Sequence, residues 1–171
     1  MRVISIGFAL VLGASLPATA DNWPTKPDPS LTPGETRPLS VSKICSIKWG
    51  TDARHVTQSM KDEVVAAYSF NVKACPLTKF NGSKVHRVEI DHLISRELGG
   101  ADTVKNLWPE CYEQVEADKS QQDDGAHKKD RLENELHNRL CANPSAALLK
   151  RYQKGIAEDW IALYREIFGD N

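Results

Sequence analysis

Apolar residues recur every fourth position in two segments of the chain, 59–68 and 126–141. A longer apolar stripe with helical spacing runs through 145–168. This periodicity predicts three amphipathic helices, the first with Ser59 as its N-cap and the last with Gly155 as a weak point.

Two shorter runs have the β-branched and apolar composition of strands. The run 85–90 follows the turn signal Asn81-Gly82, and the run 104–108 follows Gly99-Gly100 and stops before Pro109. We expect the two runs to form a hairpin-like pair, with Pro109 ending the second strand. Helices before and after this pair predict a mixed α+β fold that is mostly helical overall.

The N-terminal part of the chain does not follow these patterns. Residues 1–20 begin with a basic Arg2, continue with an apolar run and end on Ala-Thr-Ala, which predicts a signal peptide. The apolar run is shorter than the roughly 20 residues that a bilayer-spanning helix needs, which argues against an uncleaved anchor. Residues 21–40 are proline-rich and predict an extended arm, so we assign 41–171 to the folded domain.

The cysteines agree with export to an oxidising compartment, either the periplasm or the outside of the cell. The four cysteines, Cys45, Cys75, Cys111 and Cys141, all follow the predicted cleavage site, and an even number favours two disulfides. Four cysteines allow three pairings. Proximity in sequence mildly favours Cys45 with Cys75 and Cys111 with Cys141.

Four short motifs occur in an order that is informative together. They are Asp91-His92, Gly99-Gly100, Asn106-Leu107 and His127 followed by Lys-Lys-Asp. The combination resembles the HNH endonuclease family, in which an Asp-His or His-His pair, a Gly-Gly loop, an Asn on a second strand and a His on the next helix form the site. The resemblance covers residues 54–141.

The resemblance implies a ββα-metal (HNH) motif with flanking helices and a metal-dependent endonuclease activity on DNA, with RNA as a second candidate substrate. His92 would be the general base, because histidine titrates near neutral pH. Asn106 would fix the loop and orient the base. Asp91 and His127 would hold one divalent ion that stabilises the developing negative charge. Oxygen and nitrogen ligands suit Mg, Mn, Ni or Zn, so the metal stays open.

Two features of this assignment are possible only if the chain folds in a particular way. Neighbours on a regular strand point to opposite faces, so Asp91 and His92 can share one site only near an irregular strand end. His127 follows Asn106 by 21 residues, across a polar and charged stretch that we expect to be a surface loop or frayed helix. Asp130, on the same predicted helix face as His127, is an alternative ligand, and His137 is another.

Charge limits how nucleic acid could be bound. Loss of Arg2 with the signal peptide would change the formal net charge from −1 to −2, which argues against a long, tightly bound DNA footprint. Local contacts to a few phosphates remain open, through a cluster such as Lys128, Lys129 and Arg131. No separate recognition domain is visible, so we expect little sequence preference.

Several other residues are expected to have structural roles. We assign His55 and His86 to structural or solvent-exposed positions, and Trp108 and Trp160 to the core rather than to base stacking. Arg54 is more consistent with a surface salt bridge than with a phosphate contact.

Functions without catalysis remain as alternatives. An exported binding module could be stabilised by disulfides, or by zinc held by Cys111, His137 and Cys141, a ligand set that suits structural zinc. A degenerate HNH-like fold could also act as an interaction protein, although it would be expected to lose Asp91 or His92. For a nuclease, an inhibitor protein is a candidate partner.

Overall fold

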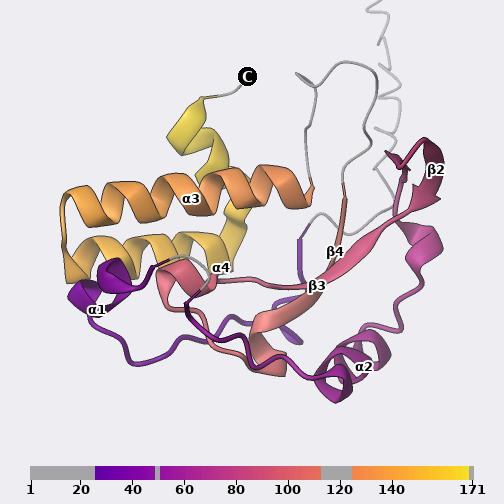
Figure 1. Ribbon diagram of the computed structural model, residues 1–171, viewed down its shortest axis with the longest axis horizontal. Helices are drawn as coiled ribbons and strands as arrows, with labels where there is room; N and C mark the ends of the chain where they lie inside the picture. The colour runs from indigo at the N-terminus through magenta and orange to yellow at the C-terminus, as the bar shows by residue number, and fades with distance from the viewer. Residues whose placement is uncertain (1–25, 49–50, 113–124, 170–171) are drawn as a thin grey trace, which may run out of the picture.

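A computed structural model describes residues 26–48, 51–112 and 125–169 of the chain (Figure 1). Helices and two small antiparallel sheets make the fold α+β, as the sequence predicts. The helices and strands, in chain order, are α1 Val41–Ser46, α2 Gln58–Ala67, η1 Val72–Ala74, β1 Leu77–Phe80, β2 Ser83–His86, β3 Val88–His92, η2 Arg96–Leu98, η3 Val104–Asn106, β4 Leu107–Cys111, α3 Ala126–Ala142 and α4 Ala146–Phe168.

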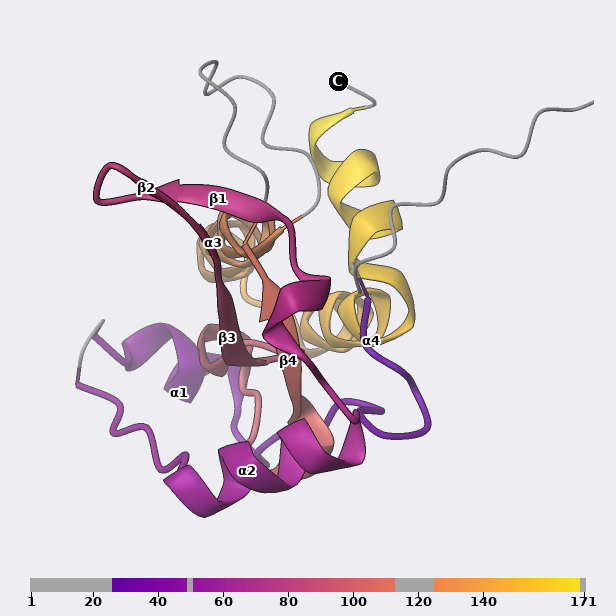
Figure 2. The same ribbon diagram turned by 90° about the vertical axis from the view of Figure 1, so that its right-hand side faces the viewer.

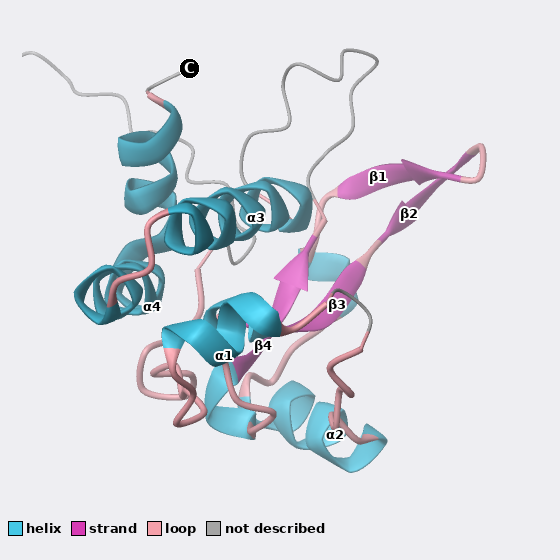
Figure 3. Cartoon of the chain, turned by 60° about the vertical axis from the view of Figure 1, so that its left-hand side comes forward, coloured by secondary structure: helices cyan, strands magenta, loops and turns pink. Residues whose placement is uncertain are grey.

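The core lies where α3 and the first part of α4 pack side by side, against α1 and η2, with Trp108 of β4 among the buried residues (Figures 1 and 3). Leu132, Leu136 and Leu140 of α3 are fully buried, which confirms the four-residue spacing seen in the sequence. Trp108 and Trp160 are each 1% exposed and belong to this core. Their predicted structural role is therefore confirmed.

The last helix is bent, and Figure 1 shows its C-terminal part turned out of line with the rest. The break lies at Asp159, which has φ −163° and ψ 89° and accepts a hydrogen bond from the Ala162 N–H at 3.0 Å, like an N-cap. The weak point was predicted at Gly155 instead. Gly155 allows close packing within the bend, since a Cβ there would lie 3.0 Å from Leu163 Cδ2.

The predicted strand 85–90 is two strands in the structure. β2 pairs with β1, which the sequence analysis did not predict, and β3 pairs with β4 in a separate sheet (Figure 2). Arg87 connects the two, and its guanidinium lies over the rings of Phe80 and Tyr112 at 4.2 and 3.8 Å. These cation–π contacts fix the point where the chain leaves one sheet and enters the other.

The predicted pairing of the two main strands is confirmed, but their ends differ from the prediction. Residues 104–106 form the short helix η3, and β4 continues through Pro109, which faces Ile90 in the register. Proline is tolerated because β4 has a hydrogen-bonded neighbour on one side only among the described residues. Helix α2 likewise begins at Gln58, and Thr57, rather than Ser59, caps it by accepting from Met60 N–H at 3.2 Å.

The described part of the proline-rich segment, residues 26–40, follows an extended path along the body of the protein. Backbone hydrogen bonds join Gly34 N–H to Lys105, Arg37 N–H to Gly99, and the Ala101 N–H to Glu35. These bonds hold the segment against η3 and the loop between η2 and η3.

Two disulfides connect distant parts of the chain. Cys45 is bonded to Cys141, and Cys75 is bonded to Cys111. The pairing favoured by sequence proximity is therefore wrong, because the fold brings α1 against the end of α3 and η1 against β4. Both cysteines of the proposed structural zinc set are oxidised, so Cys111, Cys141 and His137 cannot hold zinc as thiolates.

Some expectations fall outside the described residues. The predicted signal peptide 1–20 and most of the polar stretch before α3, residues 113–124, belong to this group. Within the described segments, no helix combines the length and apolar composition needed to cross a bilayer.

Candidate functional site

The pair Asp91 and His92 occupies the last two positions of β3. Strand alternation directs the two side chains differently: Asp91 faces Lys129 of α3, while the His92 ring faces the loop that carries Asp102. At the strand end the two still approach each other, with 3.8 Å between Asp91 Oδ1 and His92 Nδ1. Strand alternation therefore separates the two side chains, as expected, but at the strand end their polar atoms still come close.

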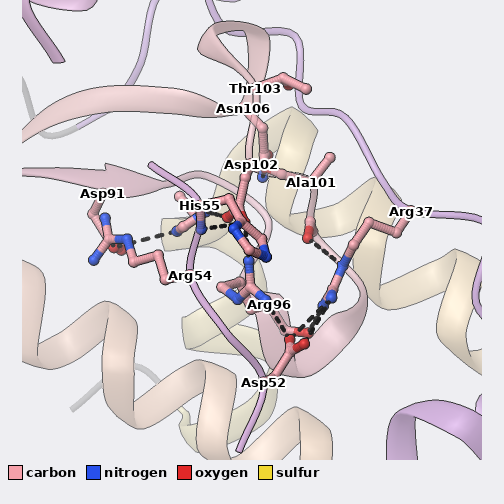
Figure 4. Close-up of polar contacts among 12 residues, drawn as sticks. Arg37, Asp52, Arg54, His55, Asp91, Arg96, Ala101, Asp102, Thr103 and Asn106 are labelled. Atoms are coloured by element: carbon pink, nitrogen blue, oxygen red, sulfur yellow. Dashed lines mark hydrogen bonds and ion pairs between the residues drawn. The ribbon is translucent and has the colours of Figure 1, made fainter. Parts of the chain in front are cut away.

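The His92 ring is held by a partly buried carboxylate. Its Nε2 lies 2.8 Å from Asp102 Oδ1. Asp102 is held in turn by the Arg96 guanidinium and by the His55 backbone N–H at 2.8 Å (Figure 4). Burial alone would raise the pKa of Asp102, but the bonds from Arg96, His55 and His92 outweigh it and hold that pKa below its usual range. An ionised Asp102 accepts a hydrogen bond from Nε2–H of His92, and in that tautomer of the neutral ring Nδ1 carries the lone pair.

The network continues beyond Arg96 to two more charged residues. Asp52 lies between the guanidinium groups of Arg96 and Arg37, at 2.6 and 2.9 Å (Figure 4). Arg37 also donates to the backbone carbonyls of Gly100 and Arg96, at 3.0 Å each. Alternating charges with defined partners on both sides make the support of Asp102 rigid.

Asn106 fixes the chain just after His92. It is fully buried, and its side-chain amide accepts from Ile94 N–H and donates to the carbonyls of Ile94 and Ala101, each at 3.0 Å. Its backbone carbonyl also accepts from the Leu93 N–H at 2.7 Å. Gly100 allows the loop to pack closely against Ile94, since a Cβ at position 100 would lie 1.8 Å from the Ile94 carbonyl oxygen. The loop-fixing position expected for Asn106 matches these contacts.

A second group of side chains gathers on the other face of β3. Glu89 and Asp91 are two residues apart and share that face, and the register places Glu110 of β4 directly opposite Glu89. One carboxylate oxygen from each lies within 4.8 Å of the other two. Among the described residues, these three form the one group of acidic, His or Cys side chains close enough to hold a metal ion.

Lys129, near the start of α3, places its ammonium against this group. The side chain is 1% exposed, and Nζ donates to Asp91 Oδ2 at 3.2 Å, to the His92 carbonyl at 2.7 Å and to Glu133 Oε1 at 2.5 Å. A buried Lys129 cannot contact a phosphate at the surface. It therefore does not belong to the phosphate-binding cluster that we expected it to form with Lys128 and Arg131.

The charges in this group depend on one another. Burial favours the neutral form of Lys129, but Glu133, Glu110 and Asp91 outweigh it and raise its pKa, so the ammonium stays charged. Burial also opposes ionisation of Asp91, yet Lys129 and His92 hold its pKa below the usual range. Burial raises the pKa of Glu133 to about 8 and that of Glu110 well above its usual value.

The helix residues considered as metal ligands are not part of the group formed by Glu89, Asp91 and Glu110. His127 is exposed and packs edge-on against the Tyr112 ring at 5.3 Å, and it is not in the metal-capable group. Asp130 is exposed as well. His137 Nε2 lies 3.5 Å from Cys141 Sγ, beside a pocket lined by Lys48, among others. The structure therefore brings Asp91, His92 and Asn106 together, while His127 lies beside Tyr112, whose hydroxyl bonds Glu89.

Sequence reasoning missed most of the partners of Asp91 and His92. The alternation of Glu89 and Asp91 along one strand was a visible signal, since residues two apart share a face. Glu110 and Asp102 gave no comparable signal, because their positions depend on strand register and on a loop. Arg54, assigned to a surface salt bridge, is exposed and lies 3.8 Å from Asp91 while donating to the Ile90 carbonyl at 2.8 Å.

Comparison of the chain with known protein families, with curated proteins and with solved structures found no match.

Proposed function

We propose that the protein is a divalent-metal-dependent endonuclease that hydrolyses phosphodiester bonds of DNA, with RNA as a second substrate to test. The observation that carries the proposal is the His92 ring, oriented through Nε2 by Asp102 and approached at Nδ1 by Asp91. A histidine oriented by a carboxylate is suited to take a proton from a water molecule.

The chain's own residues supply the base and its support. His92 Nδ1 takes the proton of the attacking water, and the carboxylates of Asp102 and Asp91 stabilise the resulting imidazolium. Asn106 holds the segment after His92 in place through its three side-chain hydrogen bonds to Ile94 and Ala101. The exposed guanidinium of Arg54, next to Asp91, is positioned to contact a substrate phosphate.

The residues on the Asp91 side fit a divalent ion. Three carboxylate oxygens close together provide hard ligands, and Asp91, the ligand expected from the sequence, is one of them. Such an ion would offset the negative charge that develops on the phosphate oxygens. His127, the second expected ligand, is not gathered with them.

A plasmid-cleavage assay tests the proposal. We expect the oxidised full-length protein to nick and linearise plasmid DNA with at least one of Mg²⁺, Mn²⁺, Ni²⁺ or Zn²⁺, and EDTA to stop the reaction. His92→Ala should reduce the rate by about 100-fold or more, the usual contribution of a general base. The same assay on single-stranded RNA determines whether RNA is cleaved.

His86→Ala is the matched control. His86 lies in β2, and its Nδ1 bonds the Cys75 carbonyl at 2.6 Å, away from Asp91 and His92. This variant should keep the wild-type cleavage rate, and circular dichroism should show that both variants are folded. Full activity of folded His92→Ala, or absence of cleavage by the wild type with all four metals, contradicts the proposal.

A further inference from the structure

The β3–β4 ribbon carries three acidic side chains on one face. Glu89 and Glu110 face each other across the two strands, and Asp91 lies two residues along from Glu89. Like charges directly opposite each other destabilise a strand pair. Glu133 of α3 adds a fourth carboxyl beside the group. Lys129 is the buried cation among them, and the exposed Arg54 lies 3.8 Å from Asp91, so two positive charges face four acidic groups.

Glu110 is the member of the group whose carboxyl oxygens lack hydrogen-bond partners. Its residue is 1% exposed, and neither carboxyl oxygen has a hydrogen-bond partner. The ammonium of Lys129 lies 3.7 Å from Oε2, beyond hydrogen-bond distance, because it donates to Asp91, Glu133 and the His92 carbonyl instead. A buried carboxyl without any hydrogen bond is costly in either protonation state.

Protonation would remove the charge of Glu110, but it would leave the Glu89 and Asp91 carboxylates close together. A cation between Glu110, Glu89 and Asp91 would bind the unsatisfied oxygen directly and also offset the repulsion across the strands. Glu89 can turn one oxygen toward such an ion while the other accepts from the Tyr112 hydroxyl at 2.9 Å.

We propose that Glu89, Asp91 and Glu110 together bind one hard divalent cation, Mg²⁺ or Mn²⁺, without a histidine ligand. Ligand sets made only of carboxylate oxygens favour Mg²⁺ and Mn²⁺, whereas Ni²⁺ and Zn²⁺ favour sets that include imidazole. The role of this ion in cleavage rests on the proposed nuclease function, but its binding does not. This ligand set differs from the expected pair of Asp91 and His127.

Mn²⁺ binding to the full-length oxidised protein is measured by electron paramagnetic resonance of free Mn²⁺, with Mg²⁺ as competitor. We expect one site in the wild type. Glu110→Gln and, separately, Glu89→Gln should raise the Mn²⁺ dissociation constant roughly tenfold or more, because each removes a ligand charge while keeping the side-chain shape. His127→Ala should leave the dissociation constant within about twofold of wild type, a change smaller than the loss of any ligand.

Glu133→Gln is the matched control for general electrostatics. Glu133 lies beside the same ammonium but outside the group of three, so this variant should change Mn²⁺ affinity less than Glu110→Gln does. The inference is overturned if the wild type binds no Mn²⁺. It is also overturned if both glutamine variants in the strands keep wild-type affinity, or if His127→Ala alone abolishes binding.

These results are separable from the nuclease assay. If the protein binds Mn²⁺ through Glu110 and Glu89 but cleaves neither DNA nor RNA, the site stands and the proposed function fails. If it cleaves DNA with a metal while both glutamine variants bind Mn²⁺ normally, the function stands and this ligand set fails. Should Glu110→Gln not fold, as shown by thermal unfolding, Glu89→Gln gives the answer alone.

Discussion

Replacing Lys129 by methionine tests the charge balance beside Asp91 most directly. The ammonium makes three hydrogen bonds, to Asp91, Glu133 and the His92 carbonyl, and its side chain is 1% exposed. Hydrogen bonds to charged groups are worth about 1.5–3 kcal/mol each, so three independent ones would amount to about 5–9 kcal/mol. The variant no longer has to bury an ammonium, which offsets part of that loss. We therefore expect Lys129→Met to lower the free energy of unfolding by about 3–5 kcal/mol.

The loss should depend on pH. In the wild type Lys129 helps to hold the pKa of Asp91 below its usual range, so Asp91 is ionised when folded. Without Lys129, burial raises the pKa of Asp91, and a raised pKa gives stability that is present at low pH and lost as pH rises. The difference between variant and wild type should therefore be larger at pH 8 than at pH 5.

Urea unfolding in EDTA, followed by the fluorescence of the buried Trp108 and Trp160, measures these free energies. Lys128→Met is the matched control, because Lys128 precedes Lys129 and its Nζ lies 4.6 Å from the Tyr164 ring. Removing that contact should cost about 1 kcal/mol or less. Equal losses in the two variants, or a Lys129→Met loss that does not grow between pH 5 and pH 8, would refute the reasoning.

Three further predictions concern the base, the buried acid and the disulfides. Asp102→Asn removes the charge that orients His92, so kcat for DNA cleavage should fall about 100-fold or more while KM changes little, as steady-state kinetics will show. The raised pKa of Glu133, about 8, predicts stability that is present below the ordinary value of 4.5 and lost up to pH 8; urea unfolding in EDTA should show this decline, and Glu133→Gln should reduce it. Non-reducing peptide mapping should find Cys45 linked to Cys141 and Cys75 to Cys111. Removing the first bridge, which joins residues 96 apart, should cost about 5 kcal/mol, and the second, 36 apart, about 4 kcal/mol.

The sequence predicted those parts of the fold that depend on local periodicity. Helices α3 and α4 match the predicted segments to within one residue, because a repeated apolar face is visible without knowing its partner. The run 85–90 was misleading, since its β-branched residues suit any strand. What divides it is the contact of Arg87 with the rings of Phe80 and Tyr112, and that contact exists only in the folded chain.

The candidate site, too, could be predicted from the sequence only in part. The motif pointed to Asp91, His92 and Asn106, whose neighbours in the structure are fixed by β3 and the loop after it. Glu110 could not be placed, because which residue of β4 faces Glu89 is decided by strand register. The predicted disulfide pairing was wrong for a similar reason. Short sequence separation favours Cys45 with Cys75, whereas the packing of α1 against α3 brings Cys45 to Cys141.

The structure changes how the adjacent Asp91 and His92 should be interpreted. If Asp91 and His127 held one ion next to the base His92, the ion and the base would have to lie on the same side of the strand. Alternation instead separates them: His92 belongs to the side supported by Asp102 and Arg96, and Asp91 belongs to the carboxylate side with Lys129. The 3.8 Å between Asp91 Oδ1 and His92 Nδ1 is where the two sides meet. We therefore interpret the pair as the junction between the proposed base and the proposed cation site, with Asp91 as the residue that both share.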